Sequence, residues 1–307
     1  MKLRTMLTAV GATALASMLL TACAQGTENP SSLGSSQELS VVVGLYPYAW
    51  LTEQIGGELV TVTNLTPPGA EPHDLELTTD QVARIAESDL TIFERSLQPA
   101  VDQAVAQAQP AHSFDITSVT PLEEHAIDAD GTLEVDPHVW LDPVRMQTIA
   151  AAISSQLALV SPAHQSTFAA NQAKLSTELA NMDEAYRTGL SNCQRSTFIT
   201  THAAFGYMAD RYHLTQVPIA GVEPDTDPSP TRIAEIQSLA IKDGITTIFF
   251  ETLVSPVLAQ SIADDLGLKT DILDPIEGIT KESRGDDYPT IMQANLTALE
   301  QANGCAA

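Results

Sequence analysis

The sequence has few basic residues: 14 Lys and Arg stand against 39 Asp and Glu in 307 residues, giving a formal net charge of −25. A protein that binds nucleic acid needs a basic surface to neutralise phosphates, so this balance excludes nucleic acid as a partner and favours attraction of cations. Three cysteines occur, and none lies in a C-x-x-C pair. The chain also lacks the H-E-x-x-H, G-x-S-x-G and P-loop patterns of common enzymes.

A long hydrophobic run occurs only at the N-terminus. Lys2 and Arg4 precede an uncharged apolar stretch over residues 6–20, which is too short and too terminal for a stable spanning helix. The following Leu-Thr-Ala-Cys ending at Cys23 resembles a bacterial lipoprotein signal, in which cleavage leaves the cysteine carrying lipid. Residues 1–22 are therefore expected to be a signal peptide, and residues 23–38, rich in Ser, Gly, Asn and Gln, a flexible tether. The alternative is an uncleaved anchor with a chance cysteine.

The other two cysteines are Cys193 and Cys305. In an exported protein an isolated pair of this kind predicts a disulfide rather than a metal site. The bond would close a loop around the C-terminal half of the chain.

Strands and helices alternate along the rest of the chain, which predicts parallel sheets with right-handed crossovers. The segment over residues 161–190 has no proline after Pro162, and it predicts a rigid helix roughly 40 Å long. The fold class is therefore α/β: an N-terminal βα lobe over residues 39–160, this connecting helix, and a C-terminal βα lobe over residues 191–307. The expected strands are 39–45, 59–65, 90–93, 113–116, 197–201, 215–219, 246–250 and 269–273, and the intervening segments are helices or loops.

The stretch Asp136-Pro-His-Val-Trp-Leu-Asp-Pro143 holds His138 in a backbone with little freedom. Each proline restricts its own φ and moves the preceding aspartate out of the α region, so the stretch is an extended or turning loop. Asp142 stands just before Pro143 at the expected start of a helix over residues 144–159. The loop can present the His138 imidazole, although a core histidine bonded to a carbonyl would fit this stretch alone.

Three further polar residues follow expected strands in the same way. His73 comes after the second strand, His202 after 197–201 and Asp274 after 269–273, while His138 follows the fourth strand. Ligands of open α/β sheets bind at the carboxyl ends of strands, so two facing lobes would bring these four side chains together. Three imidazoles and one carboxylate suit Zn²⁺ in tetrahedral geometry.

Five motifs taken in order resemble those of the metal-binding solute-binding proteins of ABC transporters. They are Glu71-Pro-His-Asp, Asp136-Pro-His-Val-Trp, Thr201-His-Ala-Ala-Phe-Gly-Tyr, Phe250-Glu and Leu273-Asp-Pro-Ile, and the similarity covers about residues 39–303. The subgroup is the zinc-uptake lipoproteins of the ZnuA and TroA type. The resemblance implies a monomer, anchored outside the cytoplasm through lipid on Cys23, that binds zinc in a cleft between the lobes and delivers it to a membrane permease with a cytoplasmic ATPase.

The resemblance also places the site residues. His73, His138 and His202 fall on the family's three histidine positions and Asp274 on its C-terminal carboxylate. Manganese-binding relatives have an acid at the third position, so His202 favours zinc. Glu251, at the end of the strand 246–250, is expected to accept a bond from a ligand imidazole, with direct ligation as the alternative.

Other functions remain as alternatives at this stage. A manganese-binding homologue differs mainly in the third ligand, and nothing in the sequence supports or excludes a surface adhesin. A zinc hydrolase needs an open coordination position for water, which a fourth protein ligand would close. The acidic segment 121–136 is expected to be a loop, and it contains a single histidine, His125.

Overall fold

Two parallel sheets of four strands each form the framework of the computed structural model, which describes residues 38–127, 133–224 and 226–306. The strand order is β2-β1-β3-β4 in the first sheet and β10-β9-β7-β8 in the second. The strands β7, β8, β9 and β10 of the second sheet occupy the positions that β1, β2, β3 and β4 occupy in the first. The two halves therefore have the same strand order. The predicted α/β class with parallel sheets is confirmed.

The first half contains the first sheet, a short antiparallel hairpin and the two longest helices. Its strands and helices are β1 (Leu39–Val43), α1 (Tyr46–Gly56), β2 (Val60–Asn64), α2 (Thr79–Glu87), β3 (Leu90–Phe93), α3 (Pro99–Ala108), β4 (Ser113–Asp115), β5 (Glu123–Ile127), β6 (Leu133–Asp136), α4 (Pro143–Val160) and α5 (Gln165–Gly189). Single 3₁₀ turns are η1 (Gly57–Leu59), η2 (Ile116–Ser118), η3 (Val139–Leu141) and η4 (Pro162–His164).

The second half contains the second sheet and its covering helices. Its elements are β7 (Thr197–Thr200), α6 (Gly206–Arg211), β8 (Thr215–Pro218), α7 (Pro230–Lys242), β9 (Thr247–Phe250), α8 (Val257–Leu266), β10 (Lys269–Ile272) and α9 (Tyr288–Asn303). The bounds of the eight expected strands agree with β1–β4 and β7–β10 to within two residues. Helix α6 begins at Gly206 because Thr201–Phe205 form the turn that carries His202.

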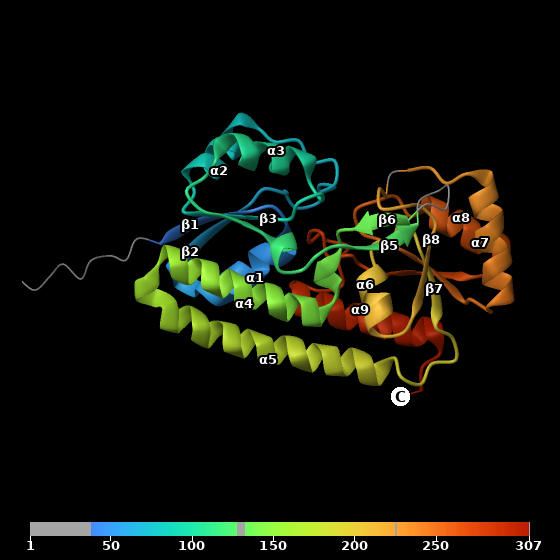
Figure 1. The fold of residues 1–307 in the computed structure, drawn as a ribbon. Helices are drawn as coiled ribbons and strands as arrows, with labels where there is room; N and C mark the ends of the chain where they lie inside the picture. The colour runs from blue at the N-terminus through green and yellow to red at the C-terminus, as the bar shows by residue number, and fades with distance from the viewer. Residues whose placement is uncertain (1–37, 128–132, 225, 307) are drawn as a thin grey trace, which may run out of the picture. The chain divides into compact units, whose positions relative to one another are not determined.

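Helices cover both faces of the first sheet (Figure 1). Helices α2 and α3 contact each other over one face, and α1 and α4 contact each other and α5 on the opposite side. A small hydrophobic core lies on the face of the first sheet that α2 and α3 cover, and it includes Val42, Phe93 and Val101. The largest core contains Leu51, Trp140 and Leu179 of the first half together with Phe198 and Tyr288 of the second. Hydrophobic packing is therefore continuous between the halves.

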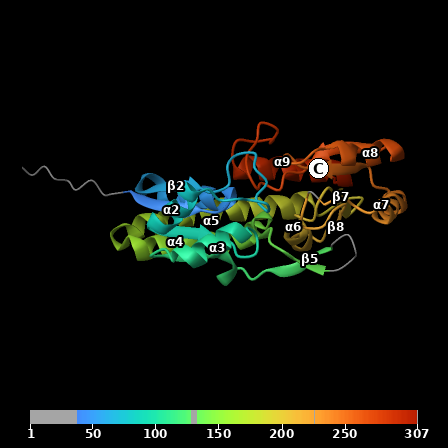
Figure 2. The ribbon, with the colours of Figure 1, turned by 90° about the horizontal axis from the view of Figure 1, so that it is seen from above.

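The predicted connecting helix is confirmed as α5, preceded by the turn η4. It contacts α1 and α4 of the first half and α9 of the second, and Figure 2 shows it running beneath both sets of elements. Its buried residues include Phe168, Leu175 and Leu179, which recur at helical spacing. The Tyr186 hydroxyl donates to the Met292 carbonyl at 2.6 Å, which ties the end of α5 to α9.

The sequence led us to expect a loop over residues 121–136. This prediction is wrong, because the segment contains the antiparallel hairpin β5–β6. Its ends are tied to α6: the Tyr207 hydroxyl donates to the Asp136 carbonyl at 2.8 Å and accepts from the Glu123 amide at 2.7 Å. Leu133 and Val135 do alternate with acids in β6, but the run has four residues and both apolar side chains are exposed, so the strand signal in the sequence was weak. The hairpin matters because it sets the position of Asp136, two residues before His138.

The predicted disulfide between Cys193 and Cys305 is confirmed, and it closes a separation of 112 residues. The two cysteines also form an antiparallel bridge, and Gln194 donates its amide to the Gly304 carbonyl at 3.3 Å. The bond thus joins the chain after α9 to the segment before β7.

Replacing Cys193 and Cys305 together by serine should lower the free energy of unfolding by about 2–5 kcal/mol, because the unfolded chain gains the freedom that the bond removes. Chemical denaturation under non-reducing conditions measures this, with the reduced wild-type chain as the matched comparison. An unchanged midpoint, or two alkylatable thiols in the native exported protein, would contradict the prediction.

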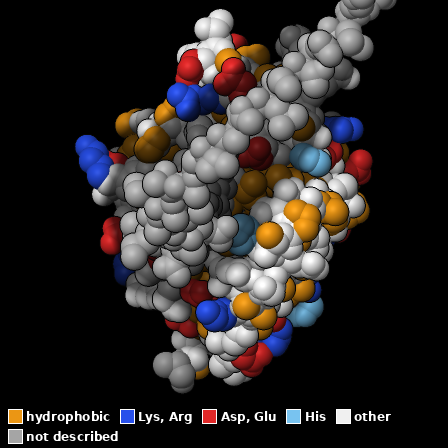
Figure 3. Space-filling view, turned by 90° about the vertical axis from the view of Figure 1, so that its left-hand side faces the viewer, with side chains coloured by type: hydrophobic (Ala, Val, Ile, Leu, Met, Phe, Trp, Pro, Cys, Tyr) orange, Lys and Arg blue, Asp and Glu red, His pale blue; other side chains and the backbone are white. Residues whose placement is uncertain are grey.

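The signal peptide, Cys23 and nearly all of the expected tether lie outside the described residues. Among the described helices, none combines the length and the hydrophobicity needed to cross a bilayer. On the face shown in Figure 3, the Lys and Arg side chains of the described residues lie apart from one another and form no continuous basic surface.

Candidate metal centre

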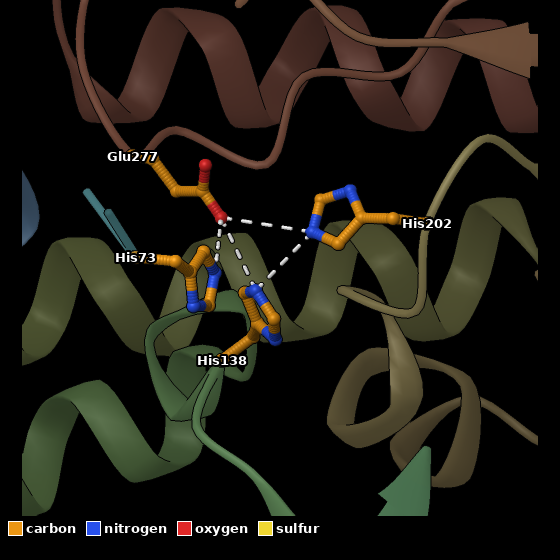
Figure 4. A group of neighbouring side chains, drawn as sticks. All are labelled: His73, His138, His202 and Glu277. Atoms are coloured by element: carbon orange, nitrogen blue, oxygen red, sulfur yellow. Dashed lines mark hydrogen bonds and ion pairs between the residues drawn. The ribbon is translucent and has the colours of Figure 1, made fainter. Parts of the chain in front are cut away.

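Three histidines and one glutamate converge at the carboxyl ends of the strands. Within residues 38–127, 133–224 and 226–306, the structure contains one group of His, Cys, Asp or Glu side chains able to hold a metal ion together. All four members are buried, and their donor atoms lie within 4.8 Å of one another (Figure 4). The group comprises His73, His138, His202 and Glu277.

The spacing of the donor atoms is regular. Oε1 of Glu277 lies 3.1 Å from Nε2 of His138, 3.6 Å from Nε2 of His73 and 3.7 Å from Nε2 of His202. The Nε2 atoms of His138 and His202 are 3.3 Å apart. Four ligands of a tetrahedral zinc ion, each about 2.0–2.1 Å from the metal, stand about 3.3 Å from one another. Four of the six distances between the donor atoms are therefore close to those of a zinc tetrahedron, and all six lie within 4.8 Å.

His73 lies on the long connection between β2 and α2. Its backbone amide donates to Oε1 of Glu71 at 3.2 Å, and Pro72 restricts the backbone between the two residues. The Nε2 atom of His73 is buried without a hydrogen-bond partner, although it faces Glu277. A buried ring nitrogen without a partner is costly unless something else occupies its lone pair, and a cation meets that need.

His138 stands immediately before the turn η3. Oδ1 of Asp136 accepts from both the backbone amide and Nδ1 of His138, at 2.9 and 2.8 Å. Because Nδ1 donates to this carboxylate, Nε2 is the nitrogen directed at the other donors. The sequence indicated that Asp136 was an acidic neighbour of His138, but not that it orients the ring.

His202 lies in the turn directly after β7. Its Nδ1 donates to Oε1 of Glu251 at 2.6 Å, and the Thr201 hydroxyl donates to the same oxygen at 2.5 Å. The Gln216 side chain donates to the His202 carbonyl at 3.0 Å and fixes the backbone. The structure thus places Glu251 beside a candidate ligand imidazole, on the side away from the other donors.

Asp274, expected as the fourth ligand, is not part of the group, and Glu277 takes its place. Oδ1 of Asp274 accepts from the Ile276 amide at 2.8 Å, and Oδ2 accepts from the Ser283 hydroxyl at 2.8 Å. Both oxygens are thus used to close the turn that Asp274 begins. The sequence contained a signal for Glu277, a second acid three residues further on, but spacing alone could not rank the two.

The protonation of the empty site follows from its contacts. Burial alone would lower the pKa of His138, but the bonds to Asp136 and Glu277 outweigh it and raise the pKa to about 9. Burial likewise opposes a charged His202, but Glu251 and Glu277 raise its pKa well above the usual range. Burial would raise the pKa of Glu277, yet the nearby imidazoles of His138, His202 and His73 hold it well below the usual range. The Glu277 carboxylate is therefore ionised and can bind a cation.

These observations define a class: a two-lobed α/β protein with a buried three-histidine, one-carboxylate cation site between its halves. Residues 41–302 match the family model described as zinc-uptake complex component A, periplasmic. The chain belongs to this family.

Relatives and solved structures agree with the assignment. The chain is 33% identical to the zinc-binding lipoprotein AdcA of Streptococcus pneumoniae over 94% of its length, although it spans 59% of that protein. It is 32% identical to the high-affinity zinc uptake system protein ZnuA of Bacillus subtilis, with 93% of this chain and 94% of that protein covered. The crystal structure of the Zn(II)-bound ZnuA-like domain of Streptococcus pneumoniae AdcA matches with a TM-score of 0.75 and 34% identity, over 87% of this chain and 99% of that domain.

Proposed function

We propose that this chain captures Zn²⁺ outside the cytoplasm with His73, His138, His202 and Glu277 and delivers it to an ABC permease driven by a cytoplasmic ATPase. The observation that carries the proposal is the spacing of the four donor atoms, 3.1 to 3.7 Å along four edges of the group. Membership of the zinc-uptake family and the zinc-binding names of the relatives support the choice of cargo.

Ligand chemistry favours zinc over manganese. Three imidazoles and one carboxylate oxygen at tetrahedral spacing suit zinc, whereas manganese prefers an octahedral set of oxygen ligands. Asp136 and Glu251 complete the site by orienting His138 and His202 through their Nδ1 atoms.

The donor set also favours binding over catalysis. A hydrolytic zinc needs a position for water, and four protein donors leave none in tetrahedral geometry. We therefore propose that the chain is not an enzyme, and that it acts as a monomer held at the membrane by lipid on Cys23. The domain boundaries 39–160, 161–190 and 191–307 remain predictions.

The chain purified without chelator should contain one zinc ion per molecule. In competition titrations, zinc should displace manganese with a preference of more than about a hundredfold, because nitrogen-rich tetrahedral sites favour zinc. Elemental analysis and a chromophoric chelator measure the two quantities. Retention of manganese in the presence of equimolar zinc would contradict the zinc assignment, and turnover of a substrate by the zinc-loaded chain would favour an enzyme.

A further inference from the structure

The turn that carries Glu277 has an unfavourable backbone. Ile276, the residue before Glu277, has a φ of 58°, in the left-handed region that a β-branched side chain rarely adopts. Its side chain is fully buried. Such a conformation persists only where the surrounding contacts hold it, and it tends to occur at functional sites.

Contacts within the second half of the chain hold one end of this turn. The Asn295 side chain accepts from the Asp274 amide at 2.9 Å and donates to the Asp274 carbonyl at 2.7 Å. Asp274 in turn accepts from the Ile276 amide at 2.8 Å. These bonds fix where the turn begins, but they act on the two residues on either side of Pro275 and leave its carbonyl free.

The Pro275 carbonyl is held from the other half of the chain. It accepts from Nε1 of Trp140 at 2.7 Å, and this bond is buried. Trp140 is fully buried and lies two residues after His138, with its ring centroid 5.1 Å from that of the His138 imidazole. One indole therefore contacts a candidate ligand of the first half and the turn that bears the candidate ligand of the second.

Trp140 is itself held in place. Its carbonyl accepts from the Tyr288 hydroxyl at 2.6 Å, and the Tyr288 ring stacks on Trp50 with centroids 4.9 Å apart. An indole fixed in this way can act as a rigid support for the Pro275 carbonyl. The bond from Tyr288 reaches the backbone of Trp140 and does not touch the turn of Glu277.

We propose that Trp140 is the positioning residue for Glu277: its indole N–H holds the strained turn in the conformation that directs the carboxylate at the three histidines. The inference rests on the proposed function, in which Glu277 is a zinc ligand. When this bond is lost, Ile276 can relax to an ordinary backbone conformation and carry Glu277 out of the group.

The proposal has a consequence for release of the ion. His202 is oriented by Glu251 of its own half, whereas Glu277 is oriented by a residue of the opposite half. Any separation of the halves breaks the bond from Trp140 to Pro275 and removes the fourth donor in the same movement. Opening then leaves His73 and His138 on the first half, away from His202 and Glu277 of the second, and zinc is bound more weakly.

The variant Trp140→Phe removes the N–H and keeps an aromatic side chain. Zinc binding to the full chain should weaken by about 10–100-fold, the usual effect of losing a group that orients a ligand. The absorption spectrum of the Co²⁺-loaded variant should change from that of a four-coordinate site toward that of a site with added water. Tyr186→Phe is the matched control, since it also removes one buried bond, from the Tyr186 hydroxyl to the Met292 carbonyl, without touching Trp140 or the turn of Glu277, and it should keep the wild-type affinity and spectrum.

A double-mutant cycle decides whether Trp140 acts through Glu277. Glu277→Ala should weaken zinc binding, and adding Trp140→Phe to it should cause no further loss. Losses that add, or the same spectral change in Tyr186→Phe, would overturn the proposal. If Glu277→Ala alone had no effect, the ligand assignment itself would be wrong, so the two failures can be told apart.

A second substitution covers the case in which Trp140→Phe does not fold. β-(3-benzothienyl)alanine at position 140 replaces the indole N–H by sulfur and keeps the shape of the ring. The same loss of zinc affinity and the same Co²⁺ spectrum are expected from it. Wild-type affinity in this variant would show that the hydrogen bond to Pro275 does not position Glu277.

Discussion

Glu277→Gln is expected to weaken zinc binding by about two to three orders of magnitude, because it removes the one anionic donor of the site. Asp274→Asn is expected to keep the affinity within about tenfold of wild type, since it changes only a group that supports the site. The asparagine oxygen can still accept from the Ile276 amide, and its amide can donate to Ser283. Both substitutions convert a buried carboxylate to an amide of the same size, so they form a matched pair.

Competition against a chromophoric zinc chelator measures both affinities. Thermal unfolding of the metal-free variants serves as the control for folding. If Asp274→Asn caused the large loss and Glu277→Gln the small one, the original expectation from the sequence would be restored, and the arrangement seen without metal would not be that of the loaded site.

The apparent zinc affinity should increase with pH up to about 9, by about tenfold per pH unit for each proton displaced. Zinc binds the neutral imidazole, so a protonated histidine must lose its proton first. Burial disfavours charge on His138, but Asp136 and Glu277 raise its pKa to about 9 in the empty site. A histidine with the ordinary pKa of about 6.5 would cause a fall in affinity only below that pH. Asp136 and Glu277 therefore move the pH range over which zinc affinity changes to higher pH.

The stability of the metal-free protein should depend on pH in the opposite sense. A histidine whose pKa is raised by folding stabilises the native state fully below its unfolded value of about 6.5, and this contribution is lost as the pH rises through its folded value. For His138 that window runs to about pH 9. The melting temperature of the metal-free protein should therefore fall across this range, while the stabilisation added by zinc grows.

Chelator competition between pH 6 and 9.5, together with thermal unfolding with and without zinc, tests both trends. In Glu277→Gln the carboxylate no longer holds the histidine protons, so the increase in affinity should level off at a lower pH. A wild-type affinity that stays constant above pH 6.5 would show that His138 is neutral in the empty site.

Local pattern was sufficient to predict most of the fold. Prolines, capping residues and β-branched runs defined nearly all helices and strands, because these features act on the backbone within a few residues. The segment before Asp136 was the exception. The hairpin β5–β6 is stabilised by Tyr207 of a distant helix, and no local pattern records that contact.

The sequence predicted the three candidate histidines as residues that follow strands, since the carboxyl ends of parallel strands share one edge of a sheet. That reason holds for His73 and His202, whereas His138 follows β6 of the antiparallel hairpin. The fourth candidate could not be predicted. Asp274 and Glu277 lie in one turn after β10, and both are acids. Which of them faces the histidines depends on the left-handed backbone at Ile276 and on the bonds that Asn295 and Trp140 make to that turn.

The sequence by itself thus determined the fold class, the disulfide and the three histidines, all of which follow from short-range backbone preference or from residue type. The tertiary structure decided the rest: the choice of Glu277 over Asp274 as the acid that joins the histidines, the carboxylates that orient His138 and His202, and the raised pKa of these two imidazoles. These depend on contacts between residues far apart in the chain. Such contacts form only when both halves are folded, and their energies depend on burial that no local segment carries.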